Sequence, residues 1–227
     1  MAIRKITFED KRYYHVFNRG VDKKIIFHDK EDLKYFLDRI NDFNNNSPVG
    51  GVMRQRLKKN KKLRGPASQL VEIVAYCVLP NHFHLLLRQA NEDGVTKFMQ
   101  RLCTGYVMYY NKKYERSGTL FQGRFKAVEL DGEGSLQILS VYVNLNYKHH
   151  RIDYDKRNVI SSLEEYIDGK NLRHSNLCSK REIKNVMGGN SDSKKLAYIK
   201  YCKMQSKYFI GNKGGDIKSI NFNEFEK

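Results

Sequence analysis

Residues 70–88 read LVEIVAYCVLPNHFHLLLR, two apolar runs separated by Pro80-Asn81. Leu70 to Leu79 is rich in β-branched and other apolar residues and predicts a strand. Pro80-Asn81 supplies a break, and His82 to Arg88 resumes as a second strand. We therefore expect an antiparallel pair. The two histidines of the second strand are expected on one side, because residues two apart share a face.

Further strands and helices are predicted on both sides of this pair in the sequence. We expect a strand over Arg12 to Phe17, a helix over Asp29 to Phe43, a helix over Val95 to Tyr114, a strand over Thr119 to Leu130 and a helix over Ser135 to His149. The order β-α-β-β-α-β followed by a helix predicts an α+β fold, the ferredoxin-like sandwich with an antiparallel sheet and helices on one face.

The remainder of the chain predicts an appendage. Beyond residue 150 the pattern weakens into short helical stretches over residues 161–167, 180–187 and 193–207, and the last dozen residues are polar and expected to fray. We expect a catalytic domain over residues 1–150 and a small helical C-terminal extension over residues 151–227. A chain of 227 residues is short for two independent enzymatic domains.

Charge predicts the class of partner. The chain has 42 basic and 25 acidic side chains, a net charge of +17, which favours a polyanionic partner and nucleic acid first. Much of the excess is clustered, as in MRQRLKKNKKLRG (residues 53–65), which we expect to be an exposed loop or hairpin. The alternative is a cationic surface that serves solubility alone.

The apolar segments and the cysteines of the chain predict its location and its thiol chemistry. No apolar run approaches the roughly 20 residues that span a bilayer, and the N-terminus has no apolar signal region. We therefore expect a cytoplasmic protein without a membrane partner. Four scattered cysteines form no CxxC pair, which argues against a zinc ribbon and predicts reduced, structural thiols.

Two weak signals concern the chemistry. His82 and His84 are expected to project to the same side, where two imidazoles can supply two of the ligands of a metal ion. The alternative is that both are surface or partly buried histidines without a metal. Tyr142 and Asn146 lie four residues apart on the last expected helix, which puts a phenol and an amide on one face. The chain has 15 tyrosines, and a helical tyrosine is more often part of a core.

The combination of motifs is more specific than either signal. YHVFNRGVDKKIIF, LPNHFHLLL, RSGTLFQGRFKA and VYVNLNYKHH occur in order between about residues 12 and 150. Together they resemble the HUH single-tyrosine transposase family, and most of all its REP-associated tyrosine transposases. The resemblance implies a metal-dependent endonuclease and strand transferase that cuts single-stranded DNA beside hairpins or palindromic repeats, through a covalent 5′-phosphotyrosine intermediate.

Carried over onto this sequence, the resemblance makes Tyr142 the nucleophile and His82, His84 and Asn146 the ligands of Mg²⁺ or Mn²⁺. Asparagine four residues after the tyrosine is the choice of the REP-associated branch, where the other branch has glutamine. Tyr147 stands where many members have proline and offers a second phenol. Because it lies on a different helical face from Asn146, Tyr142 remains the expected nucleophile.

Basic residues inside the matching blocks are the expected contacts to DNA phosphates. They are Arg19, Lys23, Lys24, Arg124 and Lys126. Two other functions stay open: a domesticated DNA-binding relative without transposition activity, and a hydrolytic metalloenzyme that uses the histidines alone. The sequence also leaves monomer and homodimer open, although many simple relatives work as dimers.

Overall fold

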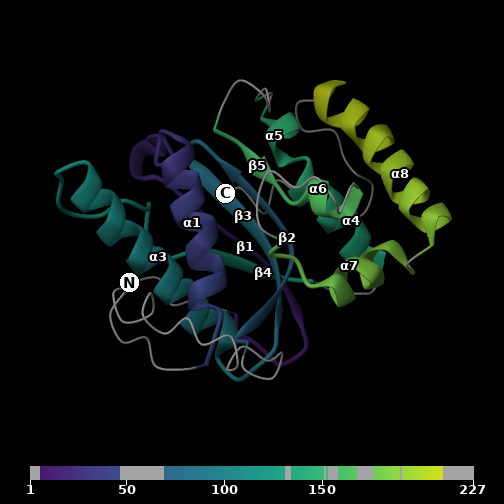
Figure 1. The fold of residues 1–227 in the computed structure, drawn as a ribbon, viewed down its shortest axis with the longest axis horizontal. Coiled ribbons are helices and arrows are strands. Elements are labelled where there is room, and N and C mark those ends of the chain that lie inside the picture. The colour runs from purple at the N-terminus through teal and green to yellow at the C-terminus, as the bar shows by residue number, and fades with distance from the viewer. Residues whose placement is uncertain are drawn as a thin grey trace.

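The computed structural model of the chain describes residues 6–46, 69–130, 134–150, 152, 158–167, 176–189 and 191–211. At its centre is an antiparallel sheet in the order β4-β1-β3-β2-β5 (Figure 1). Its strands are β1 (Tyr13–Arg19), β2 (Val71–Leu79), β3 (His82–Gln89), β4 (Lys126–Glu129) and β5 (Ile160–Ser161). The predicted β2–β3 pair is confirmed, and so is the ferredoxin-like α+β fold.

Helices cover both faces of this sheet (Figure 1). One face carries α1 (Lys30–Phe43) and α3 (Gly94–Lys113), the two helices of the β-α-β-β-α-β unit. The other face carries α4 (Gly134–Asn144) and α5 (Asn146–His149), together with α6 (Leu163–Ile167), α7 (Lys180–Met187) and α8 (Asp192–Gly211) of the extension. The expected arrangement with helices on one face therefore holds for the unit itself, and later elements add the second layer.

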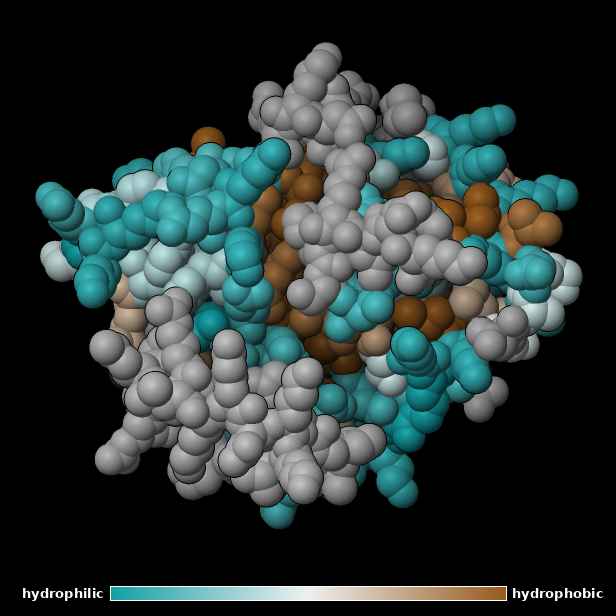
Figure 2. All heavy atoms as spheres, viewed as in Figure 1, coloured by the Kyte–Doolittle hydropathy of each residue, from teal (hydrophilic) through white to brown (hydrophobic). Residues whose placement is uncertain are grey.

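Alternation along β3 explains the two layers. Phe83 points toward α1, where its ring centroid lies 5.0 Å from that of Phe36. His84 points the opposite way, toward α4, and its ring lies 6.1 Å from that of Tyr142. Burying an aromatic side chain such as Phe83 contributes about 1.5–3 kcal/mol. Figure 2 shows apolar side chains gathered between the helical layers while the outer surface is mostly hydrophilic.

Two boundaries differ from the sequence prediction. The strand expected over Thr119 to Leu130 is wrong at its start, because residues 119–125 form a loop that meets the sheet at the bridge between Gly20 and Phe121 and at a hydrogen bond from Asn18 Nδ2 to Gly123 O. Gly123 has a φ value of 144°, which interrupts an extended strand. The last expected helix is divided at Leu145, with φ −105° and ψ 10°, into α4 and α5.

The start of the chain shows a smaller difference. Asn18 and Arg19, which follow the strand expected over Arg12 to Phe17, belong to β1 as well. They pair with Phe83 and His82 of β3. A 3-10 turn, η1 (Val21–Lys23), follows after Gly20. The longer strand brings Arg19 beside the histidine pair.

The extension covers the outer edge of β2. Besides pairing with the two residues of β5, the backbone of β2 is hydrogen-bonded by side chains and amides of residues 162–179. These contacts are Ser162 N to Tyr76 O at 2.9 Å, Tyr76 N to Ser162 Oγ at 2.8 Å, Tyr166 Oη to Val74 O at 2.7 Å and Ser179 N to Ile73 O at 2.8 Å. These bonds satisfy edge groups that would otherwise need water.

The remaining expectations concern the basic stretch, the C-terminal tail, membrane-spanning helices and the cysteines. The basic stretch of residues 53–65 and the tail beyond residue 211 lie outside the described residues. Among the described helices, none has the length and apolar character needed to cross a membrane. All four cysteines are free, and burial raises the pKa of the Cys77 thiol to about 12, in keeping with a structural role.

Candidate active site

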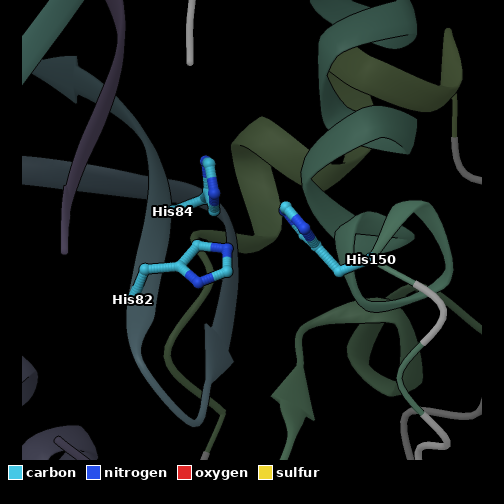
Figure 3. Close-up of side chains that lie close together, drawn as sticks. All are labelled: His82, His84 and His150. Atoms are coloured by element: carbon cyan, nitrogen blue, oxygen red, sulfur yellow. The ribbon is translucent and has the colours of Figure 1, made fainter. Parts of the chain in front are cut away.

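Two histidines of β3 form the centre of the site. Strand register places His82 opposite Arg19 and His84 opposite Phe17, and both imidazoles are buried. They project from one side of β3 toward a third ring, that of His150 (Figure 3). Nitrogen atoms of the three imidazoles all lie within 4.8 Å of one another. The structure therefore adds His150 to the pair that the sequence analysis singled out.

The Nδ1 atoms of His82 and His84 are both hydrogen-bonded to neighbouring side chains. Nδ1 of His82 donates to the Oδ1 atom of Asn81 at 2.6 Å, and the amide nitrogen of Asn81 in turn donates to the Lys23 carbonyl at 3.0 Å. Nδ1 of His84 lies 2.9 Å from Nε2 of His15 in β1. Metal-binding histidines are typically oriented in this way through the nitrogen that does not bind the ion. The Nε2 atoms are then the ones left to bind a cation.

Electrostatics keep His84 in the form that binds metal. Burial holds the pKa of its imidazole well below the usual value, and the positive charges that His15, His82, His150 and Arg19 can carry act in the same direction. A depressed pKa means a neutral ring at physiological pH. Neutral imidazole is the ligand form of histidine.

Tyr142 reaches this cluster from α4. Its ring stands edge-on to those of His15 and His84, with centroid distances of 5.9 and 6.1 Å, and 5.9 Å from the ring of His149. The side chain is only 1% exposed. Tyr147, the second phenol considered, is buried in α5 and 9% exposed.

The buried side-chain amide of Asn146 is a second indication of a binding site. Its side chain is fully buried, yet neither amide atom has a hydrogen-bond partner in the described part of the chain. The same is true of Nε2 of His84. Because buried polar atoms normally have partners, these atoms fit a site built for a further group. The donor set of imidazole nitrogens and an amide oxygen suits a divalent cation.

Beside the histidines lies a basic cavity of about 370 Å³. Four of the five basic residues expected to contact DNA line it, and among the described residues no acidic one does. The lining comprises Phe17, Asn18, Arg19, Lys23, His82, His84, Gln122, Arg124 and Lys126. Lys24 is the exception, because its ammonium group lies outside the lining, 3.9 Å from the Asp22 carboxylate. A cavity walled by cations and neutral polar groups suits a polyanion.

His15 and His150 are the residues that the sequence analysis missed. His15 is fully buried between the rings of Phe17 and His84, with centroid distances of 5.1 Å to each. It lies 69 residues from His84, and only the pairing of β1 with β3 joins them. His150 had a local signal, since it follows Asn146 by one helical turn.

Comparisons with known proteins relate the sequence and the fold of this chain to transposases. Residues 66–146, which include His82, His84, Tyr142 and Asn146, match the family model for IS200-like transposases. A solved structure of a REP-associated tyrosine transposase bound to a REP hairpin has a similar fold, with a TM-score of 0.50 and 10% sequence identity. The alignment covers 79% of this chain and 98% of that one. No curated protein matches. The resemblance to HUH single-tyrosine transposases is confirmed.

Proposed function

We propose that this chain, a transposase of the IS200 and REP-associated type in sequence and fold, is a metal-dependent endonuclease and strand transferase for single-stranded DNA. It cuts beside DNA hairpins in the cytoplasm through a covalent 5′-phosphotyrosine intermediate. The observation that carries the proposal is the position of Tyr142, whose ring lies 6.1 Å from that of His84 in the histidine cluster. The basic cavity lined by His82 and His84 supports it.

Tyr142 supplies the nucleophile. Its phenolic oxygen attacks the scissile phosphorus, so a P–Oη bond forms while the bond from phosphorus to the 3′ oxygen breaks. The phenolic proton is lost, and the departing 3′ oxygen takes up a proton to become a hydroxyl. The phosphotyrosine ester conserves the bond energy, and the reverse attack by a 3′-hydroxyl rejoins strands without ATP.

His82, His84 and Asn146 would hold the Mg²⁺ or Mn²⁺ ion. When bound there, such an ion polarises the phosphate and offsets the charge that develops on its oxygens. The protein's own part is to orient the ligands: Asn81 fixes the ring of His82, and His15 fixes that of His84. The pKa of His84, kept low by burial, leaves it ready to bind without first losing a proton.

The basic cavity would hold the DNA backbone. Arg19, Lys23, Arg124 and Lys126 surround the histidines, so phosphates on either side of the scissile one can each meet a cation. Lys24 would serve as an outer contact. The solved transposase with a similar fold is bound to a REP hairpin, and we propose a hairpin or palindromic repeat with an unpaired flank as the substrate here.

The proposal is tested by trapping the covalent adduct. Wild-type protein, Tyr142→Phe and the matched control Tyr147→Phe are incubated with a labelled hairpin oligonucleotide that carries a single-stranded flank. We expect a denaturant-resistant adduct from the wild type and from Tyr147→Phe, and none from Tyr142→Phe, although the latter still binds the hairpin. Adduct formation by Tyr142→Phe together with its loss in Tyr147→Phe would reassign the nucleophile.

One observation favours a second function. Tyr142 is 1% exposed, so its hydroxyl must become accessible before it meets a phosphodiester. A domesticated relative that binds hairpins without cutting them would not need that change. The same experiment separates the two, because such a protein retains hairpin binding but gives no adduct from the wild type with either Mg²⁺ or Mn²⁺.

A further inference from the structure

We propose that His150 is a ligand of the same metal ion, so that this chain presents three imidazoles and the Asn146 amide rather than two imidazoles and an amide. The inference rests on the metal site of the proposed function and adds a residue to it. Its consequence is a change in metal preference, which can be measured without DNA.

Proximity is the first argument. The ring of His150 lies 4.6 Å from that of His82, at an interplanar angle of 78°, and the ring of His82 lies 5.1 Å from that of His84. Figure 3 shows the three rings converging on one space, two from β3 and one from the segment after α5. Their nitrogens lie within 4.8 Å of one another. That separation is close to the spacing of ligands on a shared ion.

The backbone explains how His150 arrives there. Tyr142, Asn146 and His150 follow one another at intervals of four residues, and helical residues four apart lie on the same face. The break at Leu145 preserves this series, since Leu145 N still donates to Val141 O at 2.9 Å and His150 N donates to Asn146 O at 3.1 Å. One helical stripe therefore presents the phenol, the amide and the imidazole in turn.

His150 is the least buried of the three rings. Nitrogens bound to one metal at about 2.0–2.1 Å can be no more than about 4 Å apart, so the cluster must contract slightly on loading. His82 and His84 are buried and fixed by neighbours. His150 is partly exposed at the end of α5, and a small side-chain rotation would bring it in.

A third imidazole changes the preferred ion. Mg²⁺ selects oxygen ligands and binds imidazole poorly, whereas ions later in the first transition series bind nitrogen more strongly. We therefore expect Co²⁺ and Mn²⁺ to bind more tightly than Mg²⁺. His150 should account for much of that difference.

The test measures Co²⁺ and Mg²⁺ affinity by calorimetry and the visible absorption of bound Co²⁺. The proteins are wild type, His150→Ala, His82→Ala and the matched control His149→Ala, which removes the imidazole of the preceding residue. Melting temperatures of the metal-free variants report on folding. We expect His150→Ala to weaken Co²⁺ binding at least about tenfold, since loss of even a residue that only orients a ligand costs 10–100-fold.

The outcomes separate this proposal from the one on which it rests. Mg²⁺ affinity should fall less than Co²⁺ affinity in His150→Ala, the Co²⁺ spectrum should change, and His149→Ala should resemble the wild type. Unchanged Co²⁺ binding in His150→Ala alongside its loss in His82→Ala would overturn the role of His150 and leave the metal site standing. Equal losses in His149→Ala and His150→Ala would also overturn it. Absence of Co²⁺, Mn²⁺ and Mg²⁺ binding in the wild type would overturn both proposals.

Discussion

Replacing His15 with phenylalanine removes both ring nitrogens, including the Nε2 atom that lies 2.9 Å from Nδ1 of His84. Phenylalanine fits the site, because His15 is fully buried and its ring already lies among those of Phe17, His84 and Tyr142. The substitution therefore keeps the packing while removing the group that orients a proposed metal ligand. We expect affinity for Mn²⁺ to fall by about 10–100-fold.

In free energy this loss is about 1.4–2.8 kcal/mol of binding, at about 1.4 kcal/mol for each tenfold. A second effect falls on the metal-free protein. The Nδ1 atom of His84 loses its hydrogen-bond partner while remaining buried, and an unsatisfied buried polar atom costs about 1–3 kcal/mol of stability. The melting temperature of His15→Phe should therefore decrease even without metal.

The measurement is a calorimetric titration of Mn²⁺ into wild type, His15→Phe and His15→Gln, with melting curves of each metal-free protein. His15→Gln offers a carbonyl oxygen that can accept from His84, so it should recover part of the affinity. A His15→Phe variant that binds Mn²⁺ within twofold of the wild type would show that His15 has only a packing role.

Three further predictions concern the site. EDTA or the substitution His82→Ala should stop cleavage of a hairpin oligonucleotide, and added Mg²⁺ or Mn²⁺ should restore cleavage only to the EDTA-treated wild type. Asn146→Ala should lose less cleavage activity than His82→Ala, and full activity in EDTA would contradict the metal requirement. If the Arg124 side chain neutralises one phosphate, Arg124→Ala should reduce the magnitude of the slope of log DNA affinity against log salt concentration by about 0.7. Deletion of residues 54–64 tests the basic stretch in the same titration, and an unchanged slope in either variant would exclude the corresponding contact. Burial depresses the pKa of His84 in the folded state, so the stability that its neutral imidazole contributes is present above the unfolded pKa of about 6.5 and is lost as pH falls toward the folded value. The melting temperature should therefore decrease below that pH, and His84→Gln should flatten the decrease; an equally steep decrease in the variant would contradict this.

Local patterns were sufficient for much of the fold. The β2–β3 pair follows from two apolar runs around Pro80-Asn81, and α7, predicted over residues 180–187, is observed over Lys180–Met187. Its Ser179 N-cap, which accepts from the Glu182 amide, and Gly188 at its C-terminus are both visible in the sequence. Such signals are strong because they act within one turn of the helix.

Features that depend on distant partners could not be predicted in this way. The loop at residues 119–125 looks like a strand in composition, yet its backbone meets the sheet at one bridge, Phe121 to Gly20, and one side-chain hydrogen bond, from Asn18 Nδ2 to Gly123 O. The role of His15 depends on strand pairing, and the second helical layer depends on where the extension packs. His150 could have been found, because its spacing from Asn146 repeats the spacing of Asn146 from Tyr142.

The covered edge of β2 restricts how two copies of the chain can associate. An open edge strand is a template on which a second sheet can continue, and two-fold dimers of β-proteins are often built in that way. Here the backbone of β2 already pairs with β5 and is hydrogen-bonded by Ser162, Tyr166 and Ser179. A homodimer therefore cannot run one continuous sheet through β2 without first displacing the extension. Its two-fold axis would instead pass beside β4 at the other end of the sheet, or between helices.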